Sequence, residues 1–173
     1  RVTPVGDVDA VSPFTVQLAN SAKQLEQEPN DTYQTATEWD IARSITGRLP
    51  NNTDTDFYRF DLSTPRYLEL AFASPGSNRN FSLTLYKDSD ANEIDGIDVL
   101  NSQATSFHMG LGMGRYYLRV RENGTTVDTV PSYILTMRES PQTNLEIESN
   151  NTLRVANAIE NGIAKKGRSY AQT

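Results

Sequence analysis

Apolar and polar residues alternate in short segments along most of the chain between residues 44 and 138. The clearest segments place apolar side chains on one face of an extended backbone, in the sets Tyr58, Phe60 and Leu62; Leu68, Leu70 and Phe72; Phe81, Leu83 and Leu85; and Tyr116, Leu118 and Val120. Weaker patterns cover residues 44–49, 106–111 and 132–138, and turn-forming residues separate all of them. About seven short strands at this spacing predict an all-β fold, an antiparallel β-sandwich in which each strand buries one face.

The segments that precede this region lack the alternation. We expect residues 1–23 to be an extended leader or linker, with one short strand near residues 14–18. Residues 32–42 contain helix-forming residues and follow Asn30 and Asp31, which are good helix-capping residues, so one short helical segment is predicted there.

An acidic motif that contains asparagine occurs twice in the chain, in the same register. Residues 26–32 read E-Q-E-P-N-D-T and are followed by Ala36, and residues 146–152 read E-I-E-S-N-N-T and are followed by Ala156. The offset, from position 26 to position 146, is 120 residues, the size of one domain. We therefore expect one domain at 24–140 and, at 141–173, a linker with the start of a second, truncated repeat. Chance agreement between acidic linkers is the alternative.

Composition removes several classes of function. The chain has no cysteine, which excludes disulfides, thiolate zinc sites and cysteine nucleophiles, and favours a bacterial or cytosolic protein. A net charge of −6 argues against a nucleic-acid ligand, and no apolar run is long enough to span a membrane. His108 is the only histidine, and neither G-x-S-x-G nor H-E-x-x-H occurs, so we expect no enzymatic activity.

The acidic motif has the residue types of a calcium site. Calcium takes six to eight oxygen ligands from carboxylates, amides, carbonyls and water. Two segments offer such oxygens with alternate spacing, residues 26–31 and the D-T-D that precedes an apolar strand. Together they supply a candidate calcium site made of Glu26, Glu28, Asn30, Asp31, Asp54 and Asp56. In the alternative interpretation, Asp31 caps a helix while Asp54 and Asp56 are turn residues.

The order of these motifs resembles the bacterial pre-peptidase C-terminal domain, a family that includes the collagen-binding domains of clostridial collagenases. The resemblance covers about residues 24–139 and rests on E-Q-E-P-N-D-T-Y-Q-T-A, Gly47, D-T-D-F-Y-R-F-D-L, L-T-L-Y-K-D, G-R-Y-Y-L-R-V and Y-I-L-T-M. It implies a β-sandwich of jelly-roll type that binds calcium through the six residues named above. The second motif departs from the family pattern, with Ser149 in the place of Pro29 and Asn151 in the place of Asp31.

Three other features have weaker interpretations. Residues 88–98 are similar to an EF-hand loop but carry Glu93 where that loop needs glycine, so an acidic turn is expected and a weak second calcium site is the alternative. The G-L-G-M-G at 110–114 indicates a hairpin turn. Tyr116, Tyr117 and Tyr133 are either strand residues or an aromatic binding surface.

Taken together, these patterns predict a non-catalytic, calcium-binding accessory module of a secreted bacterial protein, located outside the cell or in the periplasm. Its expected roles are stability, secretion or substrate attachment of a parent hydrolase. The alternative is a carbohydrate- or collagen-like protein-binding module in which calcium is incidental. The expected partners are an extracellular protein or polysaccharide and a parent or neighbouring domain, with no nucleic acid.

Overall fold

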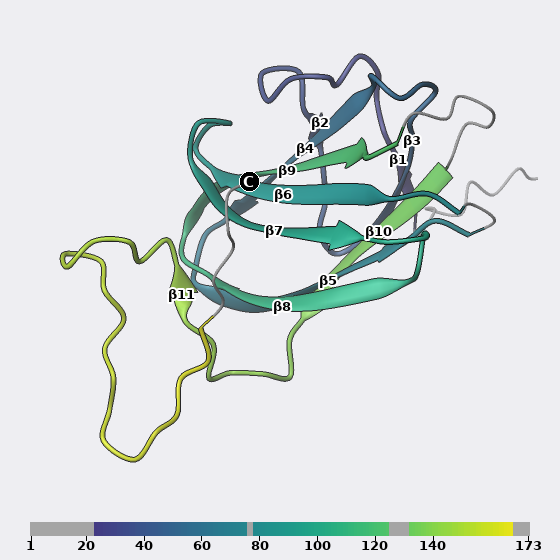
Figure 1. Ribbon diagram of the computed structural model, residues 1–173. Helices are drawn as coiled ribbons and strands as arrows, with labels where there is room; N and C mark the ends of the chain where they lie inside the picture. Colours follow the sequence, from purple (N-terminus) through teal and green to yellow (C-terminus); the bar gives the residue numbers. More distant parts are fainter. Residues whose placement is uncertain (1–22, 76–77, 125–131, 168–173) are drawn as a thin grey trace, which may run out of the picture.

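Two β-sheets pack face to face in the computed structural model, which describes residues 23–75, 78–124 and 132–167 (Figure 1). In these residues one sheet has the strand order β1 (Lys23–Leu25), β3 (Ser44–Arg48), β10 (Ser132–Glu139), β5 (Arg66–Ala73), β8 (Thr105–Leu111) and β11 (Ile147–Glu148). The other sheet has the order β2 (Thr37–Glu38), β4 (Thr55–Leu62), β9 (Gly114–Glu122), β6 (Phe81–Lys87) and β7 (Glu93–Val99). The predicted all-β sandwich is confirmed.

Strand direction matches the prediction in the middle of each sheet and differs at its edges. The long strands pair antiparallel, as in β4 with β9 and β5 with β8. Three short edge strands pair parallel instead, namely β1 with β3, β2 with β4 and β11 with β8. Parallel pairing needs a long connection rather than a hairpin, and in each of these pairs at least one other strand lies between the two partners in the sequence.

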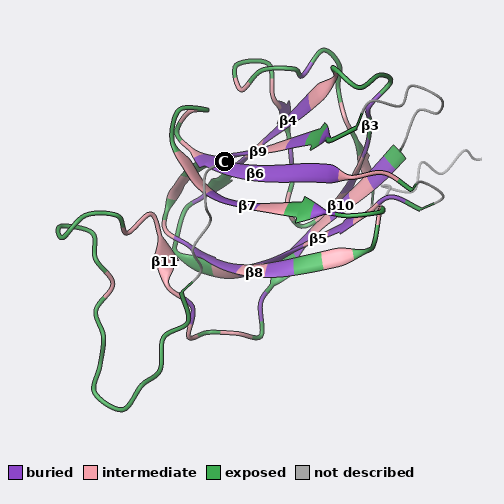
Figure 2. Cartoon of the chain, in the orientation of Figure 1, coloured by how far each residue is buried: buried purple, intermediate pink, exposed green. Residues whose placement is uncertain are grey.

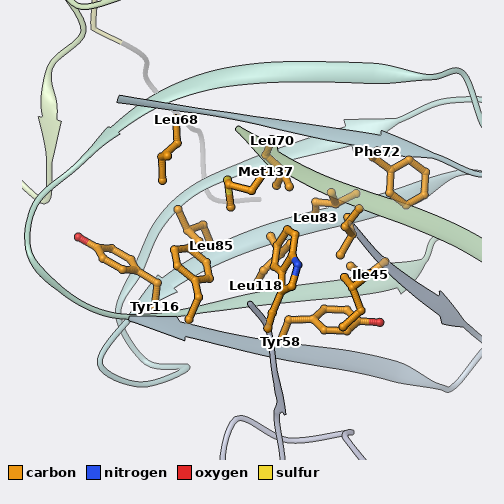
Figure 3. Close-up of a cluster of buried hydrophobic side chains, with 14 of the residues drawn as sticks. Ile45, Tyr58, Leu68, Leu70, Phe72, Leu83, Leu85, Tyr116, Leu118 and Met137 are labelled. Atoms are coloured by element: carbon orange, nitrogen blue, oxygen red, sulfur yellow. The ribbon is translucent and has the colours of Figure 1, made fainter. Parts of the chain in front are cut away.

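The core lies between the two sheets and is formed by the alternating residues that the sequence indicates. Tyr58, Phe72 and Leu118 point into it from three different strands (Figure 3). Strand β6 lies between β9 and β7 in its sheet and is buried along almost its whole length (Figure 2). Each fully buried leucine or phenylalanine contributes about 1.5–3 kcal/mol relative to an exposed one, so this layer supplies most of the favourable free energy of folding.

The helix predicted at 32–42 is wrong, because no helix occurs in the residues that the structure describes. The segment instead forms a turn in which the Thr35 N–H donates to the Thr32 carbonyl over 3.1 Å, followed by β2. Trp39 then inserts into the core with 2 % of its surface exposed, and its backbone N–H donates to the Arg59 carbonyl over 2.8 Å. These tertiary contacts outweigh the small intrinsic preference of the segment for a helix.

Two of the predicted turns also need correction. The acidic segment 88–98 is a turn only at its start, because Glu93–Val99 forms β7, an edge strand paired with β6. Ile94 and Ile97 pack against the core, and the burial of these two side chains favours a strand although β7 also contains Glu93, Asp95 and Asp98. The turn at 110–114 is present but is no hairpin, since it joins β8 of one sheet to β9 of the other. The leader and the strand predicted at 14–18 lie almost wholly outside the described residues.

After β10 the chain leaves the sandwich and returns once to its edge. Residues 147–148 form β11, which adds to the free side of β8, and a long exposed loop follows (Figures 1 and 2). Gly110 in β8 allows this approach, because a Cβ atom at that position would lie 2.2 Å from the Glu146 carbonyl oxygen. The contact between the tail and β8 therefore depends on the missing side chain.

Gly110→Ala should loosen the tail without unfolding the sandwich. The added methyl group collides only with the tail, and overpacking of this kind costs about 1–3 kcal/mol. Hydrogen exchange of the Gly112 amide, which donates to the Glu148 carbonyl over 3.2 Å, should become roughly tenfold faster or more. Gly112→Ala is the matched control, since the nearest neighbour of its Cβ would lie at 3.6 Å. Equal exchange in both variants would contradict the assignment.

Candidate metal centre

The two acidic segments meet at one end of the sandwich. The Glu26 N–H donates to the Thr46 carbonyl over 3.1 Å, which extends the β1–β3 pairing to the first acidic residue. The Phe57 N–H donates to the Asn30 carbonyl over 2.9 Å and ties the same segment to β4. Asp54 and Asp56 flank Thr55, the first residue of β4. The fold thus brings residues 26–31 and 54–56 together, although more than twenty residues separate them in the sequence.

Three carboxylates converge most closely. One oxygen atom each from Glu26, Glu28 and Asp56 lies within 4.8 Å of the other two. Glu28 is exposed, Glu26 is half-buried and Asp56 is completely buried. The cluster therefore runs from the surface to the floor of the site, and like charges ~4 Å apart cost about 1 kcal/mol in water and about 4 at an effective dielectric constant of 20.

Asn30 lies between these carboxylates, with none of its surface exposed. Its side-chain oxygen is 3.0 Å from both a Glu28 oxygen and an Asp56 oxygen, while its nitrogen is 3.3 Å from the Thr37 hydroxyl. An amide oxygen that faces two carboxylate oxygens is unfavourable unless a cation lies between them. Rotation of the amide by 180° also relieves the conflict, because the nitrogen would then donate to both carboxylates. Either arrangement makes Asn30 the polar residue around which the acidic groups are grouped.

Asp31 and Asp54 form a second group beside the first. Their side chains interact directly, and the charge of Glu28 acts on Asp54 as well. One Asp54 oxygen accepts from the Thr55 N–H over 3.0 Å. Its other oxygen is buried without a hydrogen-bond partner in the described part of the chain. All six residues named from the sequence therefore lie in one neighbourhood, and an unsatisfied carboxylate oxygen is available within it.

Two buried tyrosines that the sequence analysis did not assign to the site donate hydrogen bonds to its carboxylates. The Tyr58 hydroxyl donates to Glu26 over 2.8 Å, and the Tyr133 hydroxyl donates to Asp56. The two hydroxyl groups are 2.6 Å apart. Both tyrosines are completely buried, so Tyr133 is not part of an exposed aromatic surface. The position of Tyr58 beside Asp56 on β4 was the available signal, because residues two apart on a strand share a face.

Gly47 makes room for this pair of hydroxyls. A Cβ atom at Gly47 would lie 2.2 Å from the Tyr58 hydroxyl oxygen and 2.5 Å from that of Tyr133. Any larger residue at this position would push the tyrosines away from the carboxylates. The glycine in β3 is therefore part of the site, although it offers no ligand of its own.

Burial and mutual repulsion raise the pKa values of the acidic groups. Burial is the largest cause for Asp56, whose pKa rises to about 9, with Glu26, Asp54 and Glu28 adding repulsion and the Tyr133 hydroxyl opposing it. The pKa of Asp54 rises to about 6 through burial, the contact with Asp31 and the charge of Glu28. Burial also raises the pKa of Glu26. Without a cation, the site retains protons that ordinary carboxyl groups release well below neutral pH.

In the presence of a chelator, the protein should lose stability as pH rises from about 5 to 9. The raised native pKa values of Asp54 and Asp56 mean that the folded chain holds more protons than the unfolded chain in this range, where carboxyl groups of the unfolded chain titrate near 4. Their contribution to stability is complete below pH ~4 and is lost as pH passes the native values. Urea unfolding in EDTA at pH 5, 7 and 9 measures this.

Asp56→Asn should remove most of that pH dependence, because the amide cannot ionise and still accepts a hydrogen bond. Asp90→Asn is the matched control, since Asp90 is exposed in the turn before β7. A stability that stays flat or increases with pH in EDTA would contradict the raised pKa values. So would an equal response of the two variants.

The sequence matches no family model, and one curated protein is similar to part of the chain. Over 95 residues, which are 55 % of this chain, it is 28 % identical to collagenase ColT of Clostridium tetani. The matched region is 10 % of that collagenase, so the chain spans about a tenth of the length of this relative.

A solved structure supports the fold over a larger part of the chain. The pre-peptidase C-terminal domain of a collagenase from Bacillus anthracis superimposes with a TM-score of 0.50 at 17 % identity, covering 65 % of this chain and 99 % of that domain. Both comparisons thus confirm the predicted resemblance to pre-peptidase C-terminal domains and collagenases, and at this identity the structural match shows the shared fold.

Proposed function

We propose that residues 24–140 are a calcium-binding accessory module. The observation that supports this most directly is the convergence of carboxylate oxygens from Glu26, Glu28 and Asp56 within 4.8 Å of one another, with the Asn30 amide oxygen facing two of them. A set made only of oxygen ligands suits calcium, which takes carboxylates, amides and water at flexible geometry. Asp31 and Asp54 extend the same set from the side.

Calcium in this site stabilises the junction between the acidic segment and the sandwich. The ion would neutralise carboxylates that otherwise repel one another, and it would tie residues 26–31 to the start of β4. Tyr58 and Tyr133 contribute by donating hydrogen bonds that orient Glu26 and Asp56 toward the shared space. The proposed role of the metal is therefore structural.

A catalytic role has little support from the geometry of the only histidine. His108 Nδ1 lies 2.9 Å from the Ser140 hydroxyl, an arrangement that could belong to a nucleophilic serine. The Ser140 oxygen also accepts from the Gln142 N–H over 3.0 Å and lies 3.3 Å from the Gln142 carbonyl. Ser140 is 7 % exposed, so the pair is better explained as the anchor of the turn after β10. We infer that the module is not an enzyme.

The collagenase relatives support a role beside a secreted hydrolase. A module of this kind would act outside the bacterial cell or in the periplasm, attached to a parent or neighbouring domain, and would aid stability, secretion or substrate attachment. The sandwich is expected to follow the jelly-roll topology that the resemblance implies. No helix in the described residues is long and apolar enough to cross a membrane.

A collagen- or polysaccharide-binding module is the second candidate, and the collagenase match favours it. The tyrosines first considered for such a surface do not provide it, because Tyr116, Tyr117 and Tyr133 are at most 6 % exposed. A pull-down on insoluble collagen, chitin and cellulose, with calcium and with EDTA, separates the two functions. Binding that persists in EDTA would make calcium incidental to this role.

Calcium should raise the melting temperature of the chain measured in 1 mM calcium relative to excess EDTA. With a dissociation constant of ~10 µM, mass action adds about 2.7 kcal/mol, which is roughly 5–10 °C for a chain of this size. Glu28→Gln should reduce the shift strongly, because it removes one of the converging carboxylates. Glu28 is exposed, so this change does not disturb the core. Glu160→Gln, which changes an exposed carboxylate in the tail, should keep the full shift. The absence of any calcium-dependent shift in the native chain would exclude the site.

A further inference from the structure

The tail from residue 144 to residue 167 repeats the fold of residues 24–47. Leu25 pairs in parallel with Thr46 in the first segment, and Leu145 pairs in parallel with Lys166 in the second. Three hydrogen bonds recur at the same 120-residue offset. The Glu26 N–H donates to the Thr46 carbonyl, and the Glu146 N–H donates to the Lys166 carbonyl. The other two pairs are Asn30 N–H to the Glu28 carboxylate with Asn150 N–H to the Glu148 carboxylate, and Arg43 N–H to the Asp40 carbonyl with Ile163 N–H to the Glu160 carbonyl.

A side-chain bridge across the segment recurs in the same way. Thr37 exchanges two hydrogen bonds with the backbone of Gln27, at 3.0 and 3.1 Å. Asn157, at the equivalent position, exchanges two with the backbone of Ile147, at 2.8 and 2.9 Å. Two different side chains thus perform the same function. The equivalence is therefore one of local structure as well as of the acidic motif.

The two copies are covered on opposite sides. In the first copy, Trp39 is 2 % exposed against Tyr58 and Phe60, and Tyr33 packs edge-on against Tyr117 with ring centroids 5.5 Å apart. The equivalent residues of the second copy have no such cover, since Ile159 is 81 % exposed and Leu153 is 100 % exposed. Apolar side chains therefore stand in solvent at the positions that attach the first copy to its own sandwich.

On the other side of the segment, the second copy is covered and the first copy is exposed. Leu145 is 8 % exposed beside β8, and β11 pairs with that strand. Its equivalent, Leu25, is 71 % exposed, and residues 27–28 belong to no strand in the described part of the chain. Each copy thus lacks the contact that the other copy makes. Residues 24–43 show how the segment packs on the sandwich that follows it, and residues 145–148 show how it pairs with the sandwich that precedes it.

We propose that residues 144–163 form a two-sided connector whose exposed apolar face binds a second β-sandwich of this same fold. One side is already seated on β8 of the first sandwich. The other side presents Leu153 and Ile159 to the β4 and β9 faces of the next sandwich, where Tyr33 and Trp39 lie in the first. The inference rests on the repeat expected from the sequence, and it is independent of calcium. It implies that two successive sandwiches are held in a defined orientation.

A tandem chain tests this, in which residues 44–140 follow residue 163 directly and so complete the second unit in register. We expect hydrogen exchange of residues 151–163 to slow at least roughly tenfold relative to the 173-residue chain, in calcium and in EDTA. Leu153→Ser with Ile159→Ser should lower the melting temperature of the second unit and leave the 173-residue chain unchanged. Unchanged exchange in a tandem chain whose second sandwich is folded would overturn the proposal.

A replacement within the existing chain decides the case if the second sandwich does not fold. Residues 144–163 are put in the place of residues 24–43, so that Leu153 and Ile159 meet the first sandwich directly. The chain should unfold cooperatively at a reduced temperature, and Leu153→Ser with Ile159→Ser in the replaced segment should reduce it further. Loss of folding, or no effect of the two serines on the melting temperature, would overturn the proposal. Burial of Leu153 and Ile159 in a dimer of the native chain would overturn it as well.

If calcium does not raise the melting temperature but hydrogen exchange of residues 151–163 slows in the tandem chain, only the metal site is rejected.

Discussion

Much of this structure depends on the carboxyl group of Asp56, which the strand register places in the core. Asp56, Tyr58, Phe60 and Leu62 alternate along β4, so the spacing that buries the three apolar residues also directs the acid inward. A one-residue slip would free Asp56 but would expose the aromatic side chains. The acid must therefore be satisfied where it lies, by a proton, by the Tyr133 hydroxyl or by a cation.

The acidic segment is held to the sandwich by more than charge. Tyr33 and Ala36 pack over Phe57, Tyr86 and Tyr117 on the outer face of the β4–β9–β6 sheet, while Trp39 enters the core beside them. The candidate ligands at residues 26–31 thus belong to a segment that apolar contacts already position. A cation would find its oxygen ligands largely assembled, which lowers the conformational entropy lost on binding.

Residues 24–47 and 144–167 share local hydrogen bonds but make different contacts. The first segment packs Tyr33 and Trp39 on the sandwich that follows it, and the second adds β11 to the edge of the sandwich that precedes it. An uncovered strand edge is a site for unwanted pairing, and β11 covers that edge of β8 over two residues. A module built in this way would gain a defined neighbour and lose an exposed edge through the same contact.

The alternation of apolar residues in the sequence was enough to predict the all-β class and the core faces of the long strands, and the types and spacing of the acidic residues were enough to name two segments as one candidate site. These depend on local periodicity and residue chemistry, which a single sequence carries. Tertiary structure alone decided the rest. Residues 32–42 became a turn and a strand because Trp39 is buried, β7 formed because Ile94 and Ile97 meet the core, and Tyr133 reached Asp56 from a strand 77 residues away. Such contacts join distant positions, and their energies exceed the local preferences that a sequence displays.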